Sequence, residues 1–267
     1  MAWVSNSLAL VLAVYIAGIG PAWAAPGGKT VGVKPLATLI TGGGSSQLAV
    51  GKLVYGGDKI TTGSGGEAQI LFPDNTKLVV GPGSSLVIDD YVANSGGSAK
   101  KLALGAAAGV FRFVSGTSHG AYSINTPSAT FGIRGTAFDF AIVNRRTLLL
   151  QYQGAVNLCG RGGSCALVNN TCEIAATNER GKPLKSTQDG FEVGNADLKK
   201  AFRYAFSQDS LASNFRIARA GSCRDSVGRA DRAAAASAAS APSSSKGSSG
   251  RSDRSRGESA PSGGGFD

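Results

Sequence analysis

One stretch of strict alternation constrains the fold of this sequence more than any other. Apolar side chains occupy every second position from Phe138 to Ile142, with smaller or polar residues between them. After the polar residues 144–146, the alternation resumes from Leu148 to Tyr152. Alternation with period two is typical of a strand that has one face in a core, and two such runs around a short polar turn predict a β-hairpin.

Turn signals divide much of the remaining chain into short β-prone segments. Residues 73–75 and 81–83 combine proline with aspartate, asparagine or glycine, and such signals recur roughly every 8 to 12 residues. The 39 glycines and the low charged fraction of 16% also favour turns and strands over surface helices. We therefore predict an all-β fold, either an antiparallel β-sandwich or a stacked-strand roll, with short C-terminal helices and a disordered tail.

Changes of composition divide the chain into five parts. An apolar run from Leu8 to Ile19, followed by small residues, predicts an export signal that is cleaved after Ala24, although no Lys or Arg precedes Lys29. An uncleaved anchor is the alternative, but the run is shorter than the roughly 20 apolar residues of a spanning helix. The predicted parts are a signal peptide at 1–24, a β domain at 29–158, a Cys-containing irregular segment at 159–194, a helical segment at 195–220 and a disordered tail at 233–267. No other stretch is apolar enough to span a membrane, so we expect a periplasmic or secreted protein.

Apolar residues at helical spacing predict the helical segment. Asn195 is the expected N-cap and Asp197 lies in the expected first turn, where a carboxylate suits the positive end of a helix. We expect the stripe that follows to pack on the β core, with partner binding as the alternative. Its residues are Leu198, Phe202, Ala205, Phe206, Leu211 and Phe215.

The four cysteines point to two disulfides. Cys159, Cys165 and Cys172 lie close together in the sequence and Cys223 stands apart, which leaves three possible pairings open. A metal site is disfavoured, because no Cys-x-x-Cys pair occurs and the only histidine, His119, is distant in the sequence.

The charge pattern excludes some classes of function. The net charge of +10 is spread along the chain, without a dense basic stripe or interleaved aromatic residues. Nucleic-acid binding is therefore not expected. What the charge supports is a general attraction to anionic envelope surfaces.

The candidate catalytic residues favour structural roles. Asp58 and Asp74 lie in Gly-Asp and Pro-Asp turns and are expected to form those turns. Asp89 and Asp90 are neighbours on a strand, so they should point to opposite faces and not converge. His119 follows a serine, but no Gly-x-Ser-x-Gly motif occurs, so a hydrolase is only a rival hypothesis. We expect no enzyme activity, no cofactor and no metal.

Four blocks of sequence, in a fixed order, carry a family resemblance. They are Gly57–Gly63, Ala68–Ser84, Thr126–Ala129 with Ile133–Phe138, and Gln153–Val156. Together they resemble the FecR-type domain over roughly residues 30 to 158. Single blocks amount to turn chemistry plus alternation, but four in order are specific at the level of the fold.

The resemblance implies a periplasmic signalling role. Family members of this kind join such a domain through one transmembrane helix to a cytoplasmic anti-sigma segment, and they contact the signalling domain of a TonB-dependent outer-membrane receptor. In this sequence we expect only the signal to precede the domain and no inner-membrane helix to follow it. We therefore expect an exported, non-enzymatic module that binds an envelope protein, such as an outer-membrane receptor or a signalling component, through an edge strand or the exposed face of the hairpin.

The candidate partner-binding residues are Arg134, Gly135 and Thr136, in the turn before the most hydrophobic strand pair. The guanidinium could bind a carboxylate of the partner. The favoured alternative is an internal role, in which Arg134 pairs with Asp139, Asp58 or a strand-end carbonyl.

A binder of cell wall or other polysaccharide is the alternative function. Such a domain would need exposed aromatic side chains on one face, whereas aromatic residues make up only 7% of the chain. We expect the relevant tyrosines to be packed: Tyr55, Tyr91, Tyr122 and Tyr152.

Overall fold

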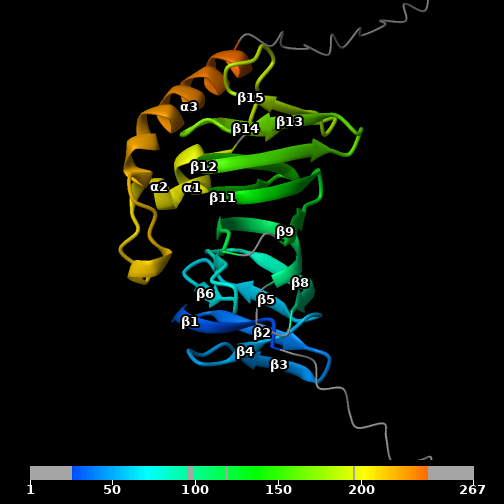
Figure 1. The fold of residues 1–267 in the computed structure, drawn as a ribbon. Coiled ribbons are helices and arrows are strands. Elements are labelled where there is room, and N and C mark those ends of the chain that lie inside the picture. The colour runs from blue at the N-terminus through cyan, green and yellow to red at the C-terminus, as the bar shows by residue number, and fades with distance from the viewer. Residues whose placement is uncertain (1–25, 95–98, 118–119, 195, 240–267) are drawn as a thin grey trace, which may run out of the picture.

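The computed structural model of the protein describes residues 26–94, 99–117, 120–194 and 196–239. Within these residues, fifteen strands form one mixed sheet and short helices follow them in the chain (Figure 1). The predicted all-β class is thereby confirmed. The strands are β1 Gly28–Lys34, β2 Ala37–Thr41, β3 Gly44–Gln47, β4 Leu53–Val54, β5 Lys59–Thr62, β6 Glu67–Leu71, β7 Lys77–Val80, β8 Ser85–Ala93, β9 Ala99–Val114, β10 Ala121–Asn125, β11 Ala129–Val143, β12 Arg146–Gly160, β13 Cys165–Val168, β14 Ile174–Thr177 and β15 Pro183–Lys185. The helices are α1 Leu198–Ala201, α2 Arg203–Phe206, η1 Ser213–Phe215, η2 Ala220–Cys223 and α3 Arg224–Ala239.

Strand β9 joins the two ends of the sheet. Its residues 99–108 pair with β8 and, in parallel, with β10, whereas residues 109–114 pair with β7 and β11. Strand β8 also pairs with β5, which pairs with β2, so the sheet turns back on itself. In Figure 1 the strands consequently lie one above another, from the N-terminal strands to β15. Of the two predicted architectures, the structure is the stacked-strand roll.

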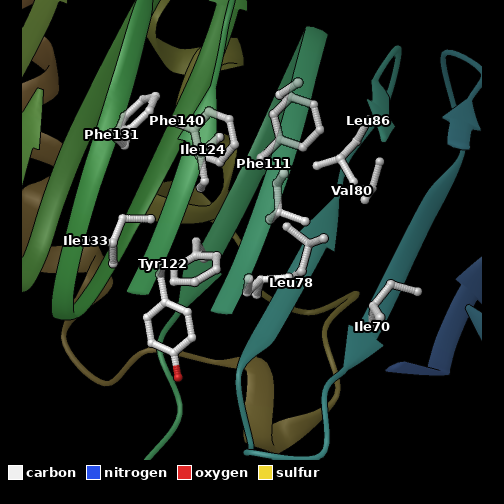
Figure 2. Close-up of a cluster of buried hydrophobic side chains, with 14 of the residues drawn as sticks. Ile70, Leu78, Val80, Leu86, Phe111, Tyr122, Ile124, Phe131, Ile133 and Phe140 are labelled. Carbon is white, nitrogen blue, oxygen red and sulfur yellow. The ribbon is translucent and has the colours of Figure 1, made fainter. Parts of the chain in front are cut away.

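The inner face of the roll is an aromatic core (Figure 2). Phe131, Phe138 and Phe140 of β11 and Phe111 of β9 are completely buried. The ring centroids of Phe111 and Phe140, which face each other across the strand pair, are 4.7 Å apart. Large buried rings in contact supply much of the energy of such a core, which explains why the predicted hairpin forms here.

The outer face of the same strands is buried too, beneath the C-terminal segment. Ala141 and Leu150 belong to a second core cluster that includes Phe202 of the helical segment. The prediction that these strands are only half buried is therefore wrong. Arg112 and Asp139 alternate with the core phenylalanines and so belong to the other strand face, yet each is 0% exposed, because residues 196–236 cover that face.

The C-terminal segment contains more helix than predicted. Asp197 is the N-cap of α1 and accepts hydrogen bonds from two backbone amides at 3.0 and 3.1 Å, whereas Asn195, the expected cap, lies outside the described residues. Helix α3 continues to Ala239, beyond the predicted helix end at 220 and the predicted tail start at 233. The alanine-rich sequence after residue 232 is a strong helix former, which the prediction overlooked. The predicted stripe packs on the sheet, with Phe202 and Leu211 buried.

Two predicted segments lie outside the described residues. These are the signal peptide at 1–24 and the part of the predicted tail from residue 240 onward. No helix in the described part of the chain combines the length and the apolar character that crossing a membrane requires.

The cysteines form two disulfides, Cys159 to Cys165 and Cys172 to Cys223, which selects one of the three pairings that the sequence left open. The first joins paired residues of β12 and β13. The second attaches η2 to the loop before β14. The segment 159–194, predicted as irregular, contains strands β13 to β15. Strand β14 is short and rich in alanine, which hides its β character.

Candidate functional site

The half of the central hairpin that is remote from its turn has an outer face that the helices leave exposed. In Figure 1 the helices lie along one end of β11 and β12, and the other end extends away from them. Burial alternates strictly along residues 129–134, with Thr130, Gly132 and Arg134 exposed. The predicted exposed face of the hairpin therefore exists, but only over this half.

Strand registers extend this face across six strands. Asp90 of β8 pairs with Ala103 of β9, which pairs with Ser123 of β10. The row continues through the paired residues of the next three strands, namely Gly132 of β11, Asn157 of β12 and Leu167 of β13. We call the outer surface along this row, at the end of the hairpin remote from its turn, the open face. Most of its side chains are small or polar, so a partner could approach the backbone closely.

Two carboxylates lie at one side of the open face, contrary to prediction. Strand β8 has a bulge between Ile88 and Asp90, and an extra residue in a strand shifts the side chains that follow it. The Asp89 carboxylate consequently lies next to Gly105, and Asp90 forms an ion pair with Lys101 at 2.9 Å. Both aspartates thus share one face. Partial burial raises the pKa of Asp89.

The three candidate partner-binding residues differ in their environments. Arg134 is exposed and forms no hydrogen bond or ion pair within the described residues, so the predicted pairing with Asp139 or Asp58 does not form. Gly135 is exposed at a bulge, where its φ of 56° is left-handed. Thr136 is buried and donates to the Gln153 carbonyl at 2.6 Å. Arg134 is thus available to a partner, and Thr136 fixes the turn that presents it.

A Gly135→Ala substitution should measure how strongly this turn depends on glycine. An added Cβ would meet nothing within 4 Å, so the cost comes from the left-handed backbone alone. We expect the free energy of unfolding to fall by about 1 kcal/mol, as measured by urea denaturation. Gly132→Ala is the matched control, because its Cβ would come no closer than 3.7 Å to Asn157 and its backbone is not left-handed. Equal losses in both variants would contradict this account.

A buried polar network lies between the sheet and the C-terminal segment. The Arg112 guanidinium binds both carboxylate oxygens of Asp139, at 2.7 and 3.0 Å. Tyr152 donates its hydroxyl hydrogen to Asp139 at 2.7 Å, and Gln208 of the C-terminal segment accepts from Arg112. Burial disfavours the charged guanidinium, but the adjacent carboxylate of Asp139 outweighs burial and raises the pKa of Arg112. The sequence did not reveal this network, because Arg112 lies 27 residues from Asp139 and 96 residues from Gln208.

The same network continues along the sheet and fixes the C-terminal segment to it. Tyr204 and Ser210 each donate to the Glu67 carboxylate at 3.0 Å. The Gln69 side chain accepts a hydrogen bond from the Ala212 amide at 2.9 Å and donates one to the Ser210 carbonyl at 3.0 Å. These specific contacts show that the C-terminal segment has one defined position on the sheet.

The chemistry of this network is structural. Asp139 is fully buried and paired with the Arg112 guanidinium, so its carboxylate does not reach solvent.

The other candidate catalytic aspartates form turns as predicted. Asp58 and Asp74 accept hydrogen bonds from the backbone amides of Tyr55 and Thr76 at 2.9 and 3.0 Å. No cluster of metal-binding side chains occurs within the described residues. His119, the residue of the hydrolase hypothesis, lies outside them.

Buried tyrosines should make the protein sensitive to alkali. Burial, followed by the charge of Asp139 or Glu67, raises the pKa of Tyr152 and of Tyr204 well above 10, and burial raises the pKa of Tyr91 to about 12. The folded state holds these phenol protons after the unfolded chain releases them at about pH 10, so stability is full below that pH and falls as the pH rises toward 12. Absorbance at 295 nm should show Tyr152 and Tyr204 ionising only as the protein unfolds. Their ionisation near pH 10 in folded protein would contradict this.

The exposed surface offers little to a sugar polymer. Among the described residues, every phenylalanine and tyrosine is buried or half-buried, and the exposed large hydrophobic side chains are aliphatic. Stacking on sugar rings would require an exposed aromatic face, as the polysaccharide hypothesis assumed.

These features define an all-β, disulfide-bridged module whose outer sheet surface is covered by the C-terminal segment over one part and open over the other. Residues 58–157 match the family model described as FecR protein, which confirms the predicted resemblance to the FecR-type domain over these residues. Two crystal structures from Parabacteroides distasonis ATCC 8503, each described as a "putative anti-sigma factor", are similar at 15% identity and a TM-score of 0.42. Each similarity covers 54% of this chain and 71% or 73% of the other. No curated protein matches the chain.

Proposed function

We propose that this chain is an exported, non-enzymatic recognition module of the cell envelope, which binds a protein partner through the open face as part of a signalling assembly. The FecR-type domain, which contains most of the open face, supports the signalling role. Disulfides persist in oxidising compartments, and the apolar sequence at the N-terminus has the character of an export signal.

The observation that carries this proposal is the exposure of one surface across six paired strands. Its small side chains, such as Gly132 and Ala103, allow a flat partner surface or an extended segment to approach the sheet. Leu167 is 53% exposed and Val92 40% exposed, which adds apolar contact area at the two sides. Arg134 provides a cation without an internal partner, suited to a carboxylate of the bound protein.

Photo-crosslinking in intact cells tests the proposal. A photoreactive residue placed at Asn157 of the full chain should give an adduct of discrete mass, whereas one at the exposed Arg229 on helix α3 should not. Adding Arg134→Glu should reduce the adduct at least tenfold without changing the melting temperature. Equal adducts at both positions, or none at Asn157, would refute recognition through this face.

Binding to isolated cell wall separates the alternative function from this one. The purified protein should stay in the supernatant when it is sedimented with cell wall. Co-sedimentation that an Arg134→Glu variant leaves unchanged would favour the polysaccharide binder and count against the proposal.

A further inference from the structure

We propose that a second site, distinct from the open face, binds a phosphate-bearing organic ligand. A cavity of about 500 Å³ lies where the turns at 127–128, 144–146 and 178–181 meet. We call it the arginine pocket. The lining residues that matter here are Ser128, Arg145, Arg146, Arg161, Glu179 and Arg180.

The excess of positive charge in the pocket is large. Four guanidinium groups line it and a single carboxylate opposes them. Arg145, Arg161 and Arg180 are exposed, and their side chains form no hydrogen bond or ion pair within the described part of the chain. Glu179 is bound to Arg146 at 2.8 Å. Three guanidinium groups are therefore free to bind an anion.

Arg146 gives the pocket a fixed, buried cation. The residue is 7% exposed, and besides Glu179 it faces Glu192 at 3.3 Å. That ion pair with Glu192 is made by the buried Nη1 atom, which forms no well-aligned hydrogen bond within the described structure. Two glutamates thus compensate Arg146 and fix its side chain in the lining, so the charge open to a ligand comes from the three exposed arginines.

The backbone presents Arg145 at an energetic cost. Asn144 and Arg145 form the turn between β11 and β12 with φ values of 50° and 63°. Turns of this kind favour glycine at the second position, because a left-handed backbone costs other residues roughly 1 kcal/mol. The left-handed turn places the Arg145 side chain at the pocket. Strain of this kind is common where a side chain has a binding role.

Hydroxyl groups support the lining residue Ser128 from behind. Ser128 shares hydrogen bonds with Thr147 at 2.7 Å and with Thr177 at 2.9 Å, and Thr126 bonds to Thr147 at 2.7 Å. This buried chain of hydroxyls holds the turn at 126–128 rigidly against β12 and β14. Ser128 thus contributes a neutral side chain to the lining, which does not repel an anion.

The chemistry of the walls selects the ligand class. Guanidinium groups bind phosphate oxygens through paired N–H donors, and several around one cavity suit a dianionic group better than a single carboxylate. The volume exceeds what one inorganic ion needs and lies within the range of roughly 300–1,000 Å³ of small-molecule sites. The ligand is therefore an organic phosphate, either soluble or part of a lipid headgroup.

Calorimetric titration of the full chain with glycerol 3-phosphate tests the pocket. We expect binding that Arg161→Ala/Arg180→Ala weakens at least tenfold without lowering the melting temperature, because both side chains are exposed. The matched control, Arg229→Ala/Arg232→Ala, removes the same charge from exposed positions of α3 and should change affinity less than twofold. Equal weakening in both variants would overturn the proposal, as would citrate binding as tightly as the phosphate.

Vesicles distinguish the two sources of phosphate. Phosphatidylglycerol vesicles that capture the natural chain, but not the Arg161→Ala/Arg180→Ala variant, would assign the pocket to a lipid headgroup. Binding of glycerol 3-phosphate without vesicle binding would assign it to a soluble ligand. Failure of both probes would refute the site and leave recognition through the open face untouched, since Arg134 does not line the arginine pocket.

Discussion

Asp139→Asn is expected to lower the free energy of unfolding by about 3–5 kcal/mol. The substitution keeps the shape of the side chain but removes its charge, which leaves the Arg112 guanidinium buried at 1% side-chain exposure without a counter-ion. A charge that is buried with a partner is tolerated, whereas the same charge left alone must be desolvated without compensation. Urea denaturation followed by circular dichroism measures the loss.

Asp90→Asn is the matched control for this prediction. Asp90 pairs with Lys101 at 2.9 Å, but the two side chains are 39% and 53% exposed. Water solvates both ions when the pair is broken, so the loss should not exceed about 1 kcal/mol. If the two substitutions cost the same, burial would not be what makes the Arg112 pair important.

The Asp139 variant should also loosen the C-terminal segment. Arg112 contacts both Asp139 and Gln208, so a displaced guanidinium removes a contact between the sheet and residues 196–236. Hydrogen exchange should accelerate first in α1 and α2, and the inner core around Phe140 should stay protected. Uniform acceleration along the chain would contradict this order.

Local patterns predicted the inner half of this fold. Phe138 and Phe140 alternate with smaller residues, and this period of two predicts that one face of the strand is buried. The turns at Asp58 and Asp74 were equally predictable, because their chemistry depends on neighbours in the chain. The stacked arrangement was not decided by these signals, since it depends on pairings such as that of β9 with β7 and β11.

Contacts between distant residues account for what the sequence did not reveal. Arg112 looks like a surface residue until Gln208, 96 positions later, lies against it. Asp89 and Asp90 should face opposite ways, and only the bulge opposite β9 brings them to one face. The arginine pocket likewise draws Arg145 and Arg180 from turns that are unrelated in sequence. Arg134 could be identified as a candidate site residue because it lies in one of the sequence blocks that carry the family resemblance. The exposure of its side chain could not be predicted.

Removing the disulfide between Cys172 and Cys223 is expected to lower the free energy of unfolding by about 4 kcal/mol. The bond closes a loop with a sequence separation of 51 residues, and restricting so long a loop in the unfolded chain has a large entropic effect. The double variant Cys172→Ser/Cys223→Ala avoids a free thiol and keeps the buried position 223 apolar. Denaturation in urea, compared with the natural chain, measures the loss.

The disulfide between Cys159 and Cys165 provides the control, because it differs mainly in the length of the loop that it closes. Cys159 and Cys165 are separated by only 6 residues, so the same chain-entropy relation gives about 2 kcal/mol for Cys159→Ser/Cys165→Ser. The location of the damage should differ as well. Loss of the longer link frees η2 and α3 from the loop before β14, whereas loss of the shorter one affects only the end of the β12–β13 pair. If both double variants lost equal stability, the effect of the longer disulfide would not come from the entropy of the loop that it closes. The polar network around Arg112 would then be what holds the C-terminal segment in place.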